Sequence, residues 1–314
     1  MPHLIERAGH SARVLTTALL SRSTFDTEAT SYDIACSGGV DSTALAILAV
    51  ATGKPVTLHH VDHGLRPSST AEAQAVETFG AELGCVVKIY EVDIVPGPNL
   101  EARAREARFG ALPDGIITGH HMDDQAETVL LNLLRGSGNR GLGAMRPGPS
   151  KPLLGLRKYE LEGLCQAYEV AVAYDETNDD ESLRRNAVRK SLLPVMERVG
   201  DRDPVPVLAR VARHARSDDD ALEELSLALI ENPYSVAQLK AVPEALRRRA
   251  LRRLIREHQA SILAPSEAEI ERIEAVVMGV VVAAQIEGNL EIRRSKGILS
   301  IQAIDGHYAS DDAN

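Results

Sequence analysis

The segment Ser37-Gly38-Gly39-Val40-Asp41-Ser42 has the residue types of a phosphate-binding loop. An apolar run ends at Cys36 and another begins at Thr43, which predicts a buried strand that leads directly into a helix. The loop would lie at the helix N-terminus, where free backbone N–H groups and the helix dipole favour an anion. Gly38 and Gly39 would let the backbone approach phosphate oxygens closely.

The polar side chains of this loop extend the prediction. Ser37 and Ser42 can donate hydroxyl hydrogen bonds to a phosphate. Asp41 would repel a phosphate unless it held a cation such as Mg²⁺ or capped the helix, so the segment suggests a metal–nucleotide complex. Strand, Gly-Gly turn and helix also occur as an ordinary connection, and the segment matches neither G-x-x-x-x-G-K-[ST] nor G-x-G-x-x-G.

Asp123, Asp124 and Glu127 form a second group of candidate residues. Spacings of three and four place these carboxylates on one face of a helix, and the buried face would consist of Val129, Leu130, Leu133 and Leu134. Acidic residues in a first turn stabilise a helix by about 0.3 to 1 kcal/mol each, but one would suffice. Because three clustered carboxylates repel each other, a cationic ligand or a metal is the better explanation.

Apolar strand patterns alternate with helical patterns between residues 32 and 119. This order predicts an α/β fold with a doubly wound parallel sheet, helices on both faces and ligands at the carboxyl ends of the strands. Polar clusters follow three of the expected strands, at residues 37–42, 60–66 and 119–125, so one shared site is expected. The histidines among them could equally be packing or loop residues.

Three further segments have two interpretations each. Residues 135–145 are glycine-rich with two arginines, which indicates either a flexible loop or an anion-binding or substrate-gating loop. Basic residues gather at 182–216 and at 247–256, as solvated faces or as a footprint for a phosphate backbone. Residues 287–301 alternate in polarity around Gly-Asn and Lys-Gly, which predicts a small hairpin.

The composition is that of a globular protein with 44% hydrophobic residues and a net charge of −10, so its overall charge does not indicate nucleic-acid binding. The three cysteines are widely spaced, which fits a reducing cytosol and no thiolate metal site. Neither a signal peptide nor a membrane span is expected. The acidic run 218–220 suggests a boundary where a connecting helix starts, between a catalytic domain (1–216) and a mainly helical smaller domain (217–314).

Six segments occur in a characteristic order: SGGVDS at 37–42, HVDHGLR at 60–66, EARAREARF at 101–109, GHHMDDQAET at 119–128, RGSG at 135–138 and RNAVR at 185–189. The first resembles the pyrophosphate loop of the N-type ATP pyrophosphatases, which adenylate a substrate carbonyl oxygen. Together the segments closely resemble the bacterial tRNA(Ile)-lysidine synthetase family over residues 32–196. Phe109 stands where that family usually has tyrosine, and the C-terminal region is short.

The resemblance implies an adenine nucleotide alpha hydrolase-like fold and a cytoplasmic enzyme that uses ATP and Mg²⁺. Its substrates would be free lysine and the isoleucine tRNA with a CAU anticodon, and lysine would be joined to the 2-carbon of the wobble cytidine through an adenylated base. The C-terminal domain would contribute to tRNA binding, and a homodimer is compatible with this assignment.

The resemblance also implies roles for single residues. The nucleotide-binding residues would be Ser37, Gly38, Gly39, Val40, Asp41, Ser42, His60 and Gly119, with Asp41 as metal ligand. The catalytic residues would be Asp41, Asp124 and Glu127, and the substrate-binding residues would be Asp124, Glu127, Arg105, Arg108, Arg185 and Arg189. Carboxylates beside a lysine ε-ammonium would keep it charged and non-nucleophilic, so the two acids are expected to bind the α-ammonium.

Three other functions are considered. A sulfur-transferring pyrophosphatase would need a catalytic cysteine pair, and an amidotransferase would need a glutaminase domain or an ammonia tunnel; 314 residues leave no room for such a domain. A catalytically silent, ATP-responsive RNA-binding module would share the loop without the chemistry. Release of pyrophosphate in the presence of the tRNA distinguishes the silent module from the ligase.

Overall fold

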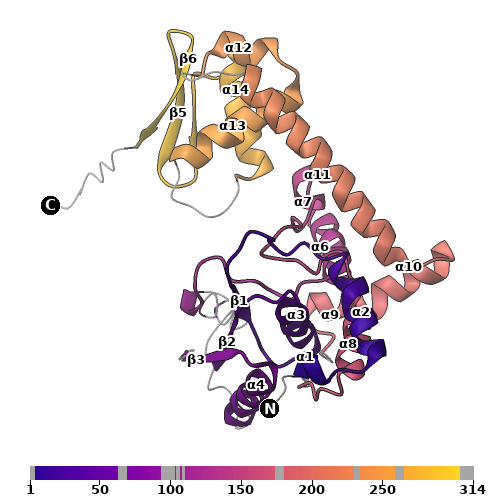
Figure 1. Cartoon of the computed structure of the whole chain (residues 1–314). Helices are drawn as coiled ribbons and strands as arrows, with labels where there is room; N and C mark the ends of the chain where they lie inside the picture. Colours follow the sequence, from indigo (N-terminus) through magenta and orange to yellow (C-terminus); the bar gives the residue numbers. More distant parts are fainter. Residues whose placement is uncertain are drawn as a thin grey trace, which may run out of the picture. The chain divides into compact units, whose positions relative to one another are not determined.

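The computed structural model describes residues 4–62, 69–92, 103, 107, 110–173, 180–229, 234–258 and 265–304. The chain divides into two compact units, Met1–Ala215 and Arg216–Asn314, and each is described by itself. Figure 1 labels the elements of both units. Most of the 101–109 segment, including Arg105 and Arg108, and residues 63–66 of the second polar cluster lie outside the described residues.

A parallel sheet forms the centre of the first unit. It consists of β1 (Tyr32–Ala35), β2 (Val56–Asp62) and β3 (Val86–Glu91), in the order β1-β2-β3. Ile34 pairs with Leu58 on one side and makes a parallel bridge to Ile117 on the other. The α/β fold with a parallel sheet is thus confirmed, although the strand expected before residue 119 is reduced to a bridge at Ile117. Because β2 pairs with one side of β1 and Ile117 bridges to the other, the carboxyl end of β1 is the position at which such sheets bind ligands.

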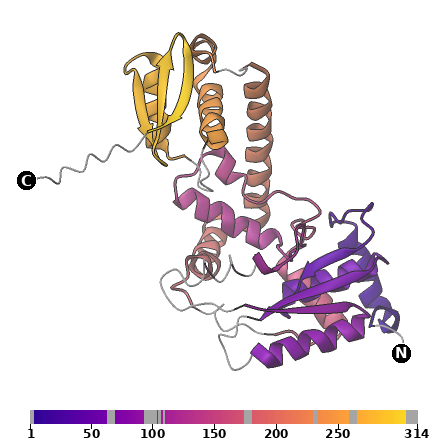
Figure 2. The same ribbon diagram turned by 90° about the vertical axis from the view of Figure 1, so that its left-hand side faces the viewer.

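One face of this sheet is covered by α3 (Val40–Ala51) and α4 (Ser69–Leu83), and α4 runs along the strands in Figure 2. A Cβ at Gly80 of α4 would lie 2.2 Å from Val87 and 3.5 Å from Leu58, so glycine permits this close approach. Residues 42–49 of α3 are all buried, because α8 (Lys158–Ala167) packs against its other side.

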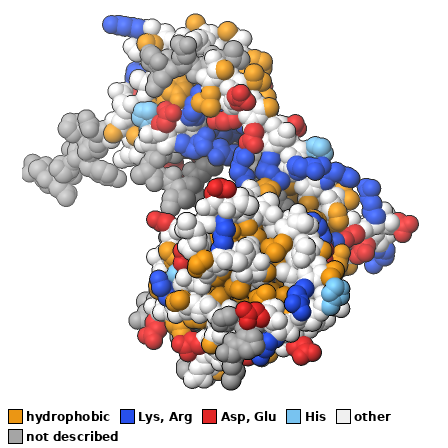
Figure 3. Space-filling view, viewed as in Figure 1, with side chains coloured by type: hydrophobic (Ala, Val, Ile, Leu, Met, Phe, Trp, Pro, Cys, Tyr) orange, Lys and Arg blue, Asp and Glu red, His pale blue; other side chains and the backbone are white. Residues whose placement is uncertain are grey.

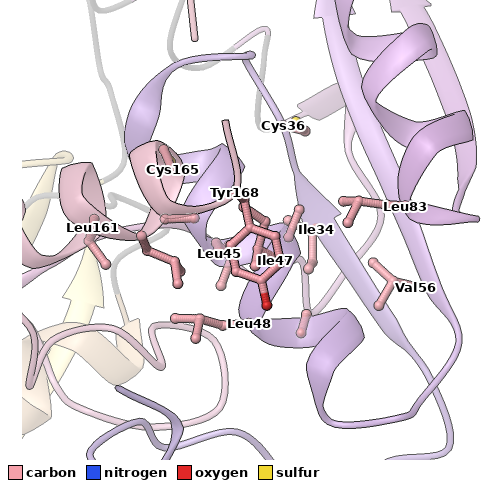
Figure 4. Close-up of a cluster of buried hydrophobic side chains, with 14 of the residues drawn as sticks. Ile34, Cys36, Leu45, Ile47, Leu48, Val56, Leu83, Leu161, Cys165 and Tyr168 are labelled. Carbon is pink, nitrogen blue, oxygen red and sulfur yellow. The ribbon is translucent and has the colours of Figure 1, made fainter. Parts of the chain in front are cut away.

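The hydrophobic core lies between this sheet and its helices. Ile34, Leu45, Ile47 and Tyr168 gather there in Figure 4. The Tyr168 hydroxyl lies 2.9 Å from the Thr16 hydroxyl of α2 (His10–Leu20), which attaches this N-terminal helix to the core. The strand and the helix that flank the 37–42 loop are therefore firmly held.

A second cluster of helices completes the first unit: α6 (Met122–Leu134), α7 (Asn139–Leu142), α9 (Arg184–Ala187), the π-helical turn η2 (Val188–Leu192), α10 (Leu193–Gly200) and the start of α11 (Pro204–Leu229). Val129 and Leu130 of α6 pack there against Val188, Leu193 and Leu208.

Helix α1 (Leu4–Arg7) precedes α2 at the start of the first unit. Two details of the expected helices were wrong. In α6, Leu133 and Leu134 are exposed, whereas Asp124 and Glu127 are buried, so the acidic face is the inner one. Helix α11 begins at Pro204 and continues through 218–220, so no helix starts at the acidic run.

The second unit combines α12 (Val236–Ala241), α13 (Glu244–His258) and α14 (Glu267–Met278) with an antiparallel sheet of β4 (Ala283–Ile286), β5 (Leu290–Ser295) and β6 (Ile298–Ala303). Lys296 and Gly297 both have positive φ, at 48° and 80°, as a two-residue hairpin turn requires. The predicted hairpin is confirmed, with β4 as an additional strand. Among the described helices of the chain, none is long and apolar enough to cross a membrane.

Candidate active site

The 37–42 loop continues β1 and ends in α3. The backbone N–H of Cys36 donates to the His59 carbonyl at 2.8 Å, and Gly38 then turns the chain with φ +81°. Gly39 is the N-cap of α3 and no side chain caps the helix, so the first N–H groups of α3 are open to an anion. The Ser42 hydroxyl accepts from the Ser37 N–H at 3.2 Å and donates to the Gly39 carbonyl at 3.0 Å, which fixes the loop.

Gly119 and His60 lie against this loop. A Cβ at Gly119 would be 2.7 Å from the Asp41 carbonyl oxygen and 3.2 Å from the Ser42 nitrogen, so only glycine fits here. The His60 ring is buried, and its Nδ1 lies 2.9 Å from the Cys36 carbonyl oxygen. The structure thus brings the ends of three strands together, and His60 braces the junction between β1 and the loop.

Asp41 projects from the first turn of α3 toward α6. Its Oδ1 is buried and has no hydrogen-bond partner among the described residues, and His121 Nε2 lies 3.4 Å from it. Among the described residues, no group of three or more His, Cys, Asp or Glu side chains could hold a metal ion by itself. Any cation at Asp41 would therefore need most of its ligands from a bound molecule or from water.

His121 is a fully buried residue between three carboxylates. Its ring nitrogens lie 3.4 Å from Asp41, 3.5 Å from Asp123 and 3.5 Å from Asp124. Burial lowers the pKa of the imidazole, but the contacts with these carboxylates outweigh burial and raise the pKa to about 10. The surrounding carboxylates therefore favour the imidazolium form of His121, which would offset part of the negative charge of the acidic cluster.

Asp123 links the N-termini of α6 and α8. Its carboxylate accepts two guanidinium N–H groups of Arg157, with the shortest contact at 3.0 Å, and the backbone N–H of Lys158 at 2.8 Å. Burial raises the pKa of this carboxyl group, but the His121 and Arg157 contacts keep it well below its usual range. Arg157 also pairs with Asp203. Asp123 is thus held as an anion by groups of the chain itself.

Asp124 and Glu127 contact two arginines from α9 and η2. Glu127 has no exposed surface, and its two oxygens accept from Arg185 Nε and Arg189 Nε, both at 2.6 Å. Arg185 Nη2 also donates to Asp124 at 2.7 Å. Burial raises the pKa of Asp124, and the charges of His121 and Arg185 lower it further than burial raises it. The four predicted substrate-binding residues Asp124, Glu127, Arg185 and Arg189 therefore form one ion-pair network.

Sequence reasoning missed this pairing, along with the contributions of His121 and Arg157. The acids are spaced by three residues on one helix, and the arginines by four on another helical segment. This complementary spacing of acids and arginines is the feature of the sequence that could have indicated the pairing. A cleft of about 220 Å³ lies beside the network, and Asp123, Glu127, Arg157 and Arg189 are among its lining residues.

The glycine-rich segment 135–145 is folded against α6. The Gln125 side-chain amide donates to the Met145 carbonyl at 2.9 Å and accepts from the Met145 N–H at 3.0 Å. Asn132 Nδ2 donates to the Gly141 carbonyl at 2.7 Å. These bonds hold the segment around α7 against α6. The segment is therefore not a wholly irregular loop.

This fold, with its glycine loop at the end of β1, defines a PP-loop ATP-binding domain, and residues 12–196 match the family profile described as "PP-loop domain". Residues 235–299 match the profile described as "TilS substrate binding domain". The chain belongs to the tRNA(Ile)-lysidine synthase family, as the resemblance indicated.

Curated relatives show the same membership. The tRNA(Ile)-lysidine synthase of Rhodococcus erythropolis is 36% identical over 259 residues, which cover 78% of this chain and 79% of the relative. The one of Nocardia farcinica is 36% identical over 86% of this chain and 91% of the relative. The one of Mycolicibacterium paratuberculosis is 40% identical over 70% of this chain and 72% of the relative.

Proposed function

We propose that this protein is an ATP-dependent tRNA(Ile)-lysidine synthase, a ligase that joins lysine to the 2-carbon of the wobble cytidine in a CAU anticodon. The observation that supports it most strongly is the close approach of Gly119 to the 37–42 loop. Together with His121, which contacts both Asp41 and Asp124, this contact supports a single site that contains the helix N-terminus of the loop and the acids Asp124 and Glu127.

The reaction has two steps. The cytidine 2-oxygen attacks the α-phosphorus of ATP, the bond to the β-phosphate oxygen breaks, and pyrophosphate leaves with that electron pair. The lysine ε-amine then attacks the 2-carbon of the adenylated base, AMP leaves with the oxygen, and the amine loses a proton. The open N–H groups at the start of α3 would bind the phosphates, where backbone donors stabilise developing negative charge.

Asp41 would be the protein ligand of Mg²⁺. Its Oδ1 is buried without a hydrogen bond, which fits a cation ligand, and Mg²⁺ commonly combines one or two carboxylates with phosphate oxygens and water. The ion would neutralise charge on the phosphates during nucleotide transfer. His121 Nε2 lies 3.4 Å from the same oxygen and would hold the carboxylate in place.

Asp124 and Glu127 would bind the α-ammonium of lysine. Both acids contact arginines, and Glu127 and Arg189 line the cleft, so a zwitterionic amino acid would meet carboxylates for its ammonium and guanidinium groups for its carboxylate. Since Arg185 and Arg189 contact these acids in the present structure, the lysine ammonium must share or displace those contacts. Released arginines would be free to bind phosphates.

The cysteines argue against the sulfur-transfer alternative. Cys36 and Cys165 are buried, and burial raises the pKa of Cys36 and raises that of Cys165 to about 12, aided by the charge of Asp41. Thiols with such pKa values are poor nucleophiles at neutral pH.

The test is incubation with ATP, Mg²⁺, radiolabelled lysine and CAU-anticodon isoleucine tRNA. We expect label in the tRNA and pyrophosphate release that requires this tRNA, with methionine tRNA as the control substrate. Asp41→Asn should abolish incorporation, while Asp114→Asn, at a distant turn of the same unit, should not. Pyrophosphate release that does not depend on the tRNA refutes the proposal. If no pyrophosphate is released, the proposal is also refuted, and the silent RNA-binding module is favoured.

A further inference from the structure

The two basic segments of the chain differ in how their charges are compensated. In α13 five of the six arginines are paired with acids of the second unit: Arg247 with Glu274, Arg248 with Glu244, Glu267 and Glu274, Arg249 with Asp219 and Glu223, Arg252 with Glu267, and Arg253 with Glu223. The sixth, Arg256, is exposed and donates to the Arg252 carbonyl. A polyanion would have to break these pairs before it could use the arginines. Despite its sequence, α13 is therefore a poor phosphate-binding surface.

The arginines of α10 and the start of α11 are different. Arg198, Arg202, Arg210 and Arg213 are all exposed, and none of them has a carboxylate within ion-pair distance among the residues that the structure describes. The nearby Asp203 is paired with Arg157. Their charges are therefore not compensated within the first unit, although the whole chain has a net charge of −10.

Arg198 lies in α10, Arg202 lies in the bend before α11, and Arg210 and Arg213 lie on the outer side of α11. Val205, Leu208 and Ala212 of α11 are buried against the α6 cluster, while Arg210 and Arg213 alternate with them and project outward. Residues three apart on a helix are neighbours on its surface. Figure 3 shows Lys and Arg side chains gathered over the part of the surface where Figure 1 places α10 and α11.

We propose that Arg198, Arg202, Arg210 and Arg213 form a binding surface for the phosphate backbone of the RNA substrate. This inference rests on the proposed function, since it assigns a place on the first unit to the tRNA. Uncompensated arginines on an acidic protein attract a polyanion without first losing an ion pair, and each phosphate contact releases condensed counterions. Because contacts with the phosphate backbone do not depend on the identity of the bases, the surface would orient the tRNA rather than select it.

The experiment compares salt dependence of tRNA binding for the full-length protein and two double variants. Arg210→Gln with Arg213→Gln removes two uncompensated charges, and Arg248→Gln with Arg252→Gln removes two compensated ones from α13 as the matched control. The dissociation constant for isoleucine tRNA is measured between 50 and 300 mM salt. Each lost phosphate contact reduces the slope of log K against log salt by about 0.7 to 0.9, so the first variant should lose about 1.5.

The control should change the slope by less than half that amount, and melting curves confirm that both variants fold. The first variant should also weaken binding of an unrelated tRNA to the same extent. An unchanged slope in Arg210→Gln/Arg213→Gln, or an equal loss in the α13 variant, overturns the proposal. Lysine incorporation by the wild type reports on the proposed function separately, because a protein without that activity could still show the slope difference.

Discussion

Replacing Glu127 by glutamine tests whether the buried ion-pair network stabilises the first unit. Glu127 has no exposed surface, and each of its oxygens is 2.6 Å from an arginine Nε. The introduced glutamine amide would retain one acceptor, but its NH₂ group would face a guanidinium donor. Arg185 and Arg189 would then lie beside Asp124 with one carboxylate instead of two.

Removing one partner of a fully buried ion pair costs about 3 to 5 kcal/mol. The arginine side chains here are 38% and 27% exposed, so water can hydrate them after the substitution, and we reduce the expected loss to about 2 to 3 kcal/mol. For a unit of this size, 1 kcal/mol shifts the melting temperature by about 2 to 4 °C. Glu127→Gln should therefore lower the melting temperature of the first unit by about 4 to 12 °C.

The assay is thermal unfolding followed by circular dichroism, with urea unfolding at 25 °C as an independent measure. Glu197→Gln is the control, because Glu197 lines the same cleft but is exposed. Adding Arg185→Gln and Arg189→Gln to Glu127→Gln should recover part of the lost stability, because these substitutions remove the arginine charges that Glu127→Gln leaves unpaired. A melting temperature within 2 °C of the wild type for Glu127→Gln would refute the structural argument. Lysine incorporation by this variant must be measured well below its melting temperature.

Four further predictions follow from the site and its surroundings. Gly119→Ala should reduce lysine incorporation by about 10²-fold, because its Cβ would displace the Asp41 carbonyl, whereas Gly163→Ala, with open space around it, should not. The folded-state pKa of Asp123 lies well below the unfolded value of about 3.9. Its contribution to the free energy of unfolding is therefore complete above that value and is lost progressively as the pH falls from there toward the folded-state pKa, so Asp123→Asn should flatten the pH dependence of urea-unfolding stability below about pH 4. Burial raises the pKa of Cys85 to about 11, so at pH 8 roughly 0.1% is thiolate, and alkylation in the folded protein should be about 200-fold slower than in urea; similar rates would contradict this. Lysine should bind more tightly with a non-hydrolysable ATP analogue than alone in calorimetry, and equal affinities would exclude coupling.

The 37–42 loop could be predicted from the sequence because it depends on neighbouring residues. An apolar strand, two glycines and a helical run specify a helix N-terminus without any information from distant parts of the chain. The short bridge at Ile117 could not be predicted in the same way, because its extent depends on pairing with Ile34 far along the chain.

The environment of the acidic cluster could not be predicted from local sequence either. Its acids were expected to face a ligand, whereas Glu127 is paired with arginines 58 and 62 residues further along. The same limitation applies to the α13 arginines, whose acids lie on neighbouring helices. A run of charge in a sequence shows how many charges are present, but only the fold shows which of them are already compensated.

Charge compensation within the site also explains why its two small substrates are expected to assist each other. The site brings together four carboxylates and four cations: Asp41, Asp123, Asp124 and Glu127 with His121, Arg157, Arg185 and Arg189. Lysine carries a net positive charge at neutral pH and would leave positive charge in excess, while ATP alone would leave negative charge in excess. Each ligand therefore compensates the charge that the other introduces, and the arginines displaced from the acids by an ammonium group gain phosphate oxygens as new partners.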